Sequence, residues 1–248
     1  MDLIGRSPQM VALRAQVARL ALLETPVLIT GETGTGKGAV AAAIHKAGPR
    51  AGRRLLAFDV AGIPESSFDG EFFGRAPAGS VGAKRGWLEE AHASSALFRH
   101  FDHWPRALQP SLLRVLRERA YVRAGECRLV AVDVRIIVTT SADPDVFLAD
   151  GTVSEALYQA LSVDAIHVPP LRERIEDIAL LARYFLARHA TDYRKDITGF
   201  VPEALSILSG YPWPGNVREL MNVVERAVIF STNKRIVPDD VASLLQVG

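Results

Sequence analysis

The chain has little of three features that would place it in a special class of protein. One cysteine, Cys127, stands among 248 residues, which excludes an internal disulfide framework and fits a reducing compartment. No run approaches the roughly 20 apolar residues of a membrane-spanning helix, and the first residues lack the basic-then-apolar plan of a signal peptide. The formal net charge is only +1, so no broad basic field predicts direct binding of nucleic acid. We therefore expect a cytoplasmic protein with no membrane partner.

The composition that remains is typical of a globular α/β protein. Nearly half of the residues, 48%, are hydrophobic, and the chain is long enough to bury a large core. Short apolar runs predict strands that alternate with helical patterns, which indicates a parallel sheet covered on both faces. The predicted strands are residues 26–30, 55–60, 96–98, 132–140 and 164–168, and helices are predicted at 9–23 and 108–116.

Two further segments of the chain have a different pattern. Residues 62–83 are rich in glycine, proline and serine, which favours an exposed loop. From residue 175 onward the pattern is helical. We interpret this as an α/β domain over residues 1–170 and a small all-helical domain over residues 171–248.

A glycine-rich segment follows the first predicted strand and opens a helix: Gly31, Glu32, Thr33, Gly34, Thr35, Gly36 and Lys37. A G-x-x-x-x-G-K match in that context predicts a phosphate-binding loop, although an ordinary glycine-rich turn is the alternative. Its backbone N–H groups and the positive end of the helix can surround phosphate oxygens, and Lys37 adds a point charge. Gly38 stands where the motif places the Ser or Thr that binds magnesium.

Several segments now occur in a characteristic order. They are residues 4–8 (IGRSP), the glycine-rich loop, residues 132–137 (VDVRII), residues 169–174 (PPLRER) and residues 213–220 (WPGNVREL). The chain resembles the AAA+ domain of bacterial sigma-54-dependent enhancer-binding activators along essentially its whole length. The resemblance implies a P-loop parallel sheet with flanking helices and a C-terminal helical lid. It also implies self-assembly into a hexamer-like ring and contact with sigma-54 RNA polymerase.

The resemblance further implies that ATP or ADP is bound between subunits. The nucleotide-binding positions carried over are Ile4, Gly5, Gly31 to Gly38, and Arg218, which matches the family's second sensor. DNA is expected to be contacted only through a domain outside this chain, because no helix-turn-helix follows the predicted lid.

Five functional positions of the family are changed. The Asp-Glu pair that holds magnesium and activates water matches Arg99 and His100, and the polar sensor, normally Asn, matches Ser141. The two arginines that reach a neighbouring subunit match Ser154 and Ala160. Arginine cannot bind a metal cation, and arginine fingers are worth about 10³ to 10⁵ in turnover. The changes predict poor hydrolysis and argue against bound magnesium, although His100 could accept a proton in principle.

The family's polymerase-contacting loop is also altered. Its Gly-Ala-Phe-Thr-Gly-Ala sequence matches Ala78, Gly79, Ser80, Val81, Gly82 and Ala83, which lack the aromatic residue and the threonine. A different contact by this loop is possible, and a bare surface loop is the alternative. His92, His100, Asp102 and His103 have no metal-binding spacing that we can defend, so we predict no metal site there.

Three functions follow from these observations. The first is the central domain of a transcription regulator that binds ATP without hydrolysing it and does not remodel sigma-54 polymerase in the usual way. The second is an active ATPase whose altered residues are compensated. The third is an oligomerisation partner that no longer binds nucleotide.

Overall fold

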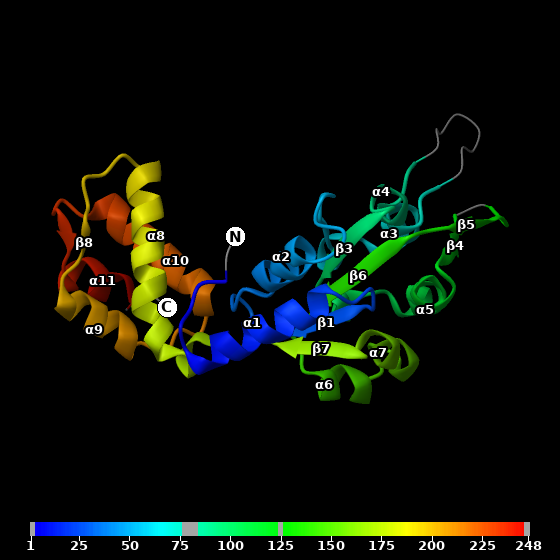
Figure 1. Ribbon diagram of the computed structural model, residues 1–248, viewed down its shortest axis with the longest axis horizontal. Helices are drawn as coiled ribbons and strands as arrows, with labels where there is room; N and C mark the ends of the chain where they lie inside the picture. The colour runs from blue at the N-terminus through cyan, green and yellow to red at the C-terminus, as the bar shows by residue number, and fades with distance from the viewer. Residues whose placement is uncertain (1–2, 76–83, 124–125, 246–248) are drawn as a thin grey trace. The chain divides into compact units, whose positions relative to one another are not determined.

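A five-stranded parallel sheet forms the centre of the first part of the chain, as the computed structural model shows for residues 3–75, 84–123 and 126–245 (Figure 1). Its strand order is β2-β3-β6-β1-β7. The strands are β1 (Val27–Thr30), β2 (Leu56–Asp59), β3 (Ser94–Arg99), β6 (Val134–Thr139) and β7 (Asp164–His167). Each lies on one of the predicted apolar runs, which confirms the predicted α/β sheet.

Both faces of the three central strands, β3, β6 and β1, are buried, whereas the edge strands β2 and β7 have alternate exposed residues. Alternate residues point to opposite faces of a strand, and on β1 Leu28 joins the large core cluster while Val27 and Ile29 are buried outside it. The helices of this part of the chain are α2 (Lys37–Ala47), α3 (Glu65–Phe72), α4 (Trp87–Glu90), α5 (Gln109–Glu118), α6 (Pro144–Ala149) and α7 (Glu155–Leu161). A short antiparallel pair, β4 (Ala120–Val122) and β5 (Leu129–Ala131), follows α5.

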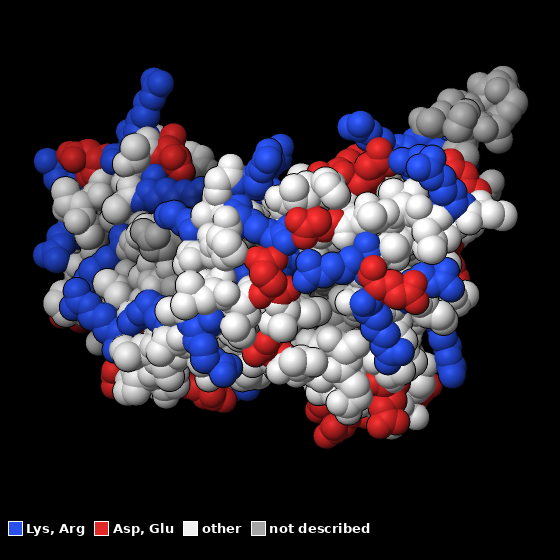
Figure 2. Space-filling view, turned by 45° about the vertical axis from the view of Figure 1, so that its right-hand side comes forward, with Lys and Arg blue, Asp and Glu red and all other residues white. Residues whose placement is uncertain are grey.

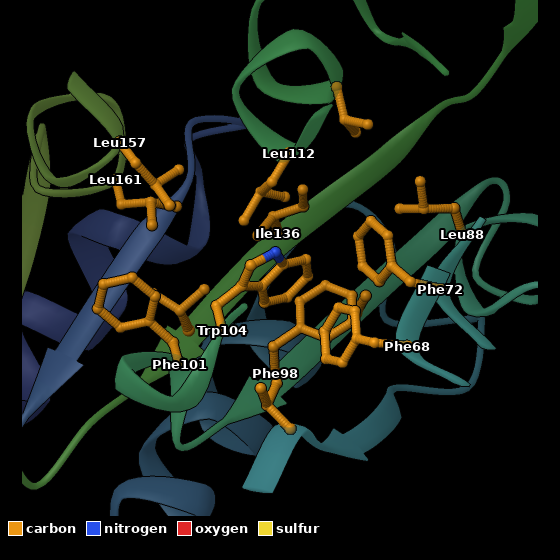
Figure 3. Close-up of a cluster of buried hydrophobic side chains, with 14 of the residues drawn as sticks. Phe68, Phe72, Leu88, Phe98, Phe101, Trp104, Leu112, Ile136, Leu157 and Leu161 are labelled. Atoms are coloured by element: carbon orange, nitrogen blue, oxygen red, sulfur yellow. The ribbon is translucent and has the colours of Figure 1, made fainter. Parts of the chain in front are cut away.

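An aromatic cluster fills the core on one face of the sheet (Figure 3). Phe72 and Trp104 pack edge to face with their ring centroids 4.5 Å apart, and Phe68 lies 4.8 Å from Trp104 in the same manner. Phe68 and Phe72 come from α3, a helix that the sequence did not predict within residues 62–83. Two fully buried aromatic side chains outweigh the loop-forming composition around them.

The described residues form two compact units, and the second is not a continuous stretch of chain. It contains residues 168–245 together with residues 3–15 and 32–36. This differs from the predicted boundary between residues 1–170 and 171–248. The physical reason is a set of hydrogen bonds to buried polar groups: the Asp177 carboxylate accepts from Ser7 Oγ at 2.6 Å, and Arg174 Nη2 donates to Thr35 O at 2.9 Å.

The second unit is otherwise helical. Two short helical turns, Leu171–Glu173 and Ile175–Asp177, lead into α8 (Ile178–Asp192), α9 (Pro202–Gly210), α10 (Asn216–Phe230) and α11 (Pro238–Leu245), with a small parallel pair, β8 (Gly199–Phe200) and β9 (Arg235–Ile236). Helix α1 (Pro8–Ala21) begins in this unit and ends in the first. Trp213 is fully buried at its centre and donates Nε1 to Leu208 O at 2.8 Å. Of the helices that the structure describes, none is long and apolar enough to cross a bilayer.

Two glycines near the lysine of the loop, Gly34 and Gly38, make a matched pair for mutation. Gly34 has φ +82°, and a Cβ there would lie 2.1 Å from Gly215 O, whereas a Cβ on Gly38 in α2 would meet nothing within 4 Å. Gly34→Ala should therefore destabilise the protein by about 1–3 kcal/mol through strain and displacement of the backbone. Gly38→Ala should be neutral or stabilising by up to about 1 kcal/mol, because alanine favours helix. Thermal unfolding midpoints measure both, and similar midpoints for the two variants would contradict this packing.

Candidate functional site

The side chain of Lys37 lies at the carboxyl end of the sheet, where the first turn of α2 begins. Its Nζ donates to Gly31 O and to Ser141 Oγ, each at 2.7 Å. Ser141 is close because β1 and β6 are neighbours in register and Thr140 N donates to Ile29 O at 3.1 Å. The structure thus brings together two residues that the sequence places 104 positions apart. A lysine and a hydroxyl at the end of parallel strands suit an anionic ligand.

The loop between Gly31 and Lys37 has the backbone that its glycines permit. Gly34 and Gly36 have φ values of +82° and +106°, which residues with a Cβ rarely adopt. A Cβ on Gly36 would meet no described atom within 4 Å, so one side of the loop is open there. This is the conformation expected of a phosphate-binding loop.

The segment from Glu32 to Gly36 is bound by residues of the second unit. Arg172 donates both terminal nitrogens to the Glu32 carboxylate, with Nη1 at 2.8 Å from Oε2. The Arg218 backbone N–H donates to Gly34 O at 3.2 Å, while the Arg218 side chain is exposed. The predicted second sensor therefore contacts the loop through its main chain, and its guanidinium extends into solvent.

The amino-terminal segment that contains Ile4 and Gly5 is held in the same unit. Ile4 packs against the hydrophobic core of the second unit. Gly5 has φ +152°, and a Cβ there would lie 2.7 Å from Asp177 Oδ2. Its carbonyl oxygen accepts from Arg14 Nη1 at 2.8 Å. The segment is thus fixed at both its backbone and its side chains.

Arg99 and His100 lie at the carboxyl end of β3. Arg99 is the last residue of the strand, is exposed, and pairs in register with Asp59 of β2 and Thr139 of β6. His100 has a left-handed backbone, φ +55°, and its Nδ1 lies 2.9 Å from Asp59 Oδ1. This hydrogen bond holds the pKa of the Asp59 carboxyl below its ordinary value. The end of β3 presents a cation and an imidazole oriented by a carboxylate.

Asp102 is occupied by a structural contact. It accepts a hydrogen bond from Thr140 Oγ1 at 2.5 Å, and His103 Nε2 lies 3.5 Å from its other oxygen. Among residues 3–75, 84–123 and 126–245, no group of three or more His, Cys, Asp or Glu side chains could hold a metal ion. At the end of β3, where the resemblance places the family's magnesium-binding carboxylate, the side chain is the guanidinium of Arg99, which is not a metal ligand.

The remaining predicted positions lie on α7 or beyond the described chain. Ser154 precedes α7 and is exposed, with its backbone N–H donating to Gln109 Oε1 at 2.8 Å. Ala160 is on the helix and partly exposed. Neither residue type can supply the positive charge of an arginine finger. Residues 78–83, the predicted partner loop, lie outside the described residues.

Sequence reasoning missed four residues that the structure places at these segments: Asp59, Arg174, Asp177 and Asn216. Arg174 and Asn216 fall inside segments quoted for the resemblance, so a search for buried polar residues in those segments could have found them. No sequence signal singles out Asp59, since its partner is 41 positions away.

Comparison with known protein families agrees with this arrangement. Residues 3–167 match the family described as the sigma-54 interaction domain, and residues 172–247 match the AAA+ ATPase lid domain. The regulatory protein AtoC of Escherichia coli (strain K12) is 38% identical over 241 residues, which is 96% of this chain and 52% of AtoC. The transcriptional regulatory protein ZraR of the same strain is 40% identical over 94% of this chain and 54% of ZraR. The chain thus spans about half the length of these relatives.

Solved structures give the same result. NtrX from Brucella abortus in complex with ATP superposes with a TM-score of 0.88 at 34% identity, covering 97% of this chain and 54% of NtrX. The same protein in complex with ADP gives a TM-score of 0.90 at 33% identity, covering 99% of this chain and 55% of NtrX. The chain therefore belongs to the sigma-54 interaction domain family of AAA+ proteins, and its C-terminal part, residues 172–247, is the AAA+ ATPase lid domain.

Proposed function

We propose that this chain is the nucleotide-binding central domain of a bacterial transcription regulator, and that it binds ATP or ADP without efficient hydrolysis. The proposal depends on a difference in side chains between neighbouring strand ends at one edge of the sheet. Lys37 and Ser141 are in contact at the end of β1 and β6, while the neighbouring end of β3 carries Arg99 and His100.

Binding is supported by the loop and by the relatives. Gly34 and Gly36 adopt positive φ values, and because glycine has no Cβ, no side chain at these two positions blocks the backbone amides. Lys37 supplies a charge for the outer phosphates. NtrX, a relative by fold and sequence, has been crystallised with ATP and with ADP. The nucleotide, when bound, would supply the anionic partner that this cation and these amides suit.

Poor hydrolysis follows from charge at the end of β3. Phosphoryl transfer depends on positioning and electrostatic stabilisation, most of which comes from metal ions and arginine fingers. Arg99 cannot bind a cation, and Ser154 and Ala160 cannot stabilise a transferring phosphoryl group in a neighbouring subunit. The guanidinium of Arg99 can instead neutralise phosphate oxygens, which makes magnesium dispensable for binding.

The partners proposed for the domain come from its family. Self-assembly into a hexamer-like ring and contact with RNA polymerase or its sigma factor are the family's mode of action. Without the aromatic residue and threonine of the usual loop, residues 78–83 do not supply the usual sigma-54 contact. Lysine and arginine are interspersed with acidic residues on the face drawn in Figure 2, and the net charge is +1, so DNA contact is assigned to a domain outside this chain.

Calorimetric titration of ATP with and without magnesium tests this proposal. Wild-type protein should bind ATP with affinities that agree within about threefold in magnesium and in EDTA, because a fixed guanidinium replaces the metal charge. Arg99→Ala should weaken binding about tenfold or more, the worth of one charged hydrogen bond. Arg114→Ala, which removes an exposed arginine on α5, is the control and should change nothing.

Binding that requires magnesium would reject the role of Arg99. No binding under either condition would favour the third candidate, a partner that joins an oligomer without nucleotide. Phosphate release at rates typical of active relatives would reject the hydrolysis-deficient assignment.

A second candidate, slow hydrolysis with a histidine base, is favoured by one contact. Asp59 Oδ1 lies 2.9 Å from His100 Nδ1, and this contact orients the imidazole ring. The other ring nitrogen, Nε2, is the one that could accept a proton from water. A carboxylate that fixes a histidine in this way is the arrangement of a general base. Such a base could activate water even though the family's glutamate is absent.

This candidate predicts that phosphate release falls when His100 is removed. His100→Ala should lower release by about 10²-fold or more, and Asp59→Asn by a smaller factor. The hydrogen bond to His100 holds the pKa of Asp59 below its ordinary value, so this carboxylate stays ionised, and able to orient the ring, to lower pH than a free aspartate. His103→Ala is the control, and release by wild type no faster than the buffer background would exclude the candidate.

A further inference from the structure

Three successive carbonyl groups of the glycine-rich loop accept hydrogen bonds from the second unit. Asn216 Nδ2 donates to Thr33 O at 3.1 Å, the Arg218 backbone N–H donates to Gly34 O at 3.2 Å, and Arg174 Nη2 donates to Thr35 O at 2.9 Å. All of these residues belong to the same compact unit. Two of the three donors are side chains that the nucleotide-binding motif does not include.

Peptide geometry converts these contacts into a direction for the loop amides. In a planar trans peptide the C=O of one residue and the N–H of the next point to opposite sides, and no peptide bond of the described chain is cis. Fixing the carbonyls of Thr33 and Thr35 toward the second unit therefore turns the N–H groups of Gly34 and Gly36 away from it. A Cβ added at Gly36 would meet nothing within 4 Å, so the space beside its Cα is also unfilled by described atoms.

The two side-chain donors are fixed in their own positions. Asn216 is fully buried, and its Oδ1 accepts from Leu171 N at 2.8 Å, so its amide nitrogen must face the loop. Its φ of +54° lies in the left-handed region that asparagine tolerates. Arg174 is 4% exposed, and Asp177 provides a compensating charge. Buried donors of this kind hold their acceptors rigidly, because breaking the bond leaves an unsatisfied polar group.

We propose that Arg174 and Asn216 are positioning residues for nucleotide binding: by holding the carbonyls of Thr33 and Thr35, they aim the amides of Gly34 and Gly36 at the phosphates. The proposal rests on the proposed function, since it concerns how the same loop receives ATP. It assigns to the lid a contribution to the phosphate loop that is made through hydrogen bonds to the loop backbone and is distinct from the sensor role predicted for the Arg218 side chain.

Affinities for ATP and for inorganic tripolyphosphate test this role. Arg174→Lys keeps the charge but shortens the reach to Thr35 O, and it should weaken binding of both ligands by the same factor, about three- to tenfold. Asn216→Gly tolerates the left-handed backbone and adds no charge but loses the donor to Thr33 O, and it should have a similar effect. Titrations are made well below the measured Tm of each variant, so that loss of folded protein does not contribute.

Arg235→Lys is the matched control. Arg235 also lies in the second unit and donates Nη2 to a backbone oxygen, Phe200 O, at 2.8 Å. It should leave both affinities within about twofold of wild type. Wild-type affinities in both test variants would overturn the proposal, as would a loss confined to ATP, because the effect would then act on the base.

The outcomes also separate this proposal from the proposed function. Wild-type protein that binds and rapidly hydrolyses ATP, with weakened binding in the two variants, would overturn only the hydrolysis-deficient assignment. Wild-type protein that binds neither ligand would overturn both. Unchanged affinity in the variants of a non-hydrolysing wild type would overturn only the positioning role.

Discussion

A phosphate loop can offer its amides to an anion only if its carbonyl groups are satisfied elsewhere. In this chain that requirement is met by Asn216, Arg174 and the main chain at Arg218, each bound to one carbonyl between Thr33 and Thr35. Two of the three donors are buried side chains, and Asp177 balances the charge of Arg174. The polar interior of the second unit thus serves the loop as well as its own fold.

The edge of the sheet at Lys37 and the neighbouring end of β3 differ in how far their side chains match those of the family. Lys37 retains a hydroxyl partner in Ser141, whereas Arg99 and His100 stand where the family keeps carboxylates. Asp59 supplies a negative charge next to Arg99 and His100, which offsets part of the added positive charge at the end of β3. This difference between the two strand ends is the physical basis for proposing nucleotide binding without efficient hydrolysis.

The sequence predicted the sheet well and the polar contacts poorly. Strands such as β1 and β6 are short, buried and apolar on both faces, so composition alone located them within two residues. The family resemblance singled out Lys37 and Ser141 separately, and the structure places them in contact at one edge of the sheet. The helix at residues 65–72 was missed because Phe68 and Phe72 are buried by distant partners in a loop-like sequence.

Hydrogen bonds to backbone oxygens explain the rest of the shortfall. The carbonyls of Thr33 and Thr35 would be the same for any residue type. The loop sequence therefore contains no signal that predicts their hydrogen-bond donors. Asp59 and His100 meet only because β2 and β3 are adjacent in the sheet, which the order of strands along the chain does not reveal. The positions assigned to Ser154 and Ala160 stay predictions of the resemblance.

The interleaved make-up of the second unit limits how the protein can be divided. A fragment starting at residue 171 would contain every helix from α8 to α11 but neither residues 3–15 nor residues 32–36. The Asp177 carboxylate would lose the amide and hydroxyl of Ser7, and the Arg174 guanidinium would lose Thr35 O, so charged groups now hydrogen-bonded would face solvent or stay unsatisfied. Any excised lid intended to fold as it does here must carry these two short stretches with it, for example joined by linkers or supplied as peptides.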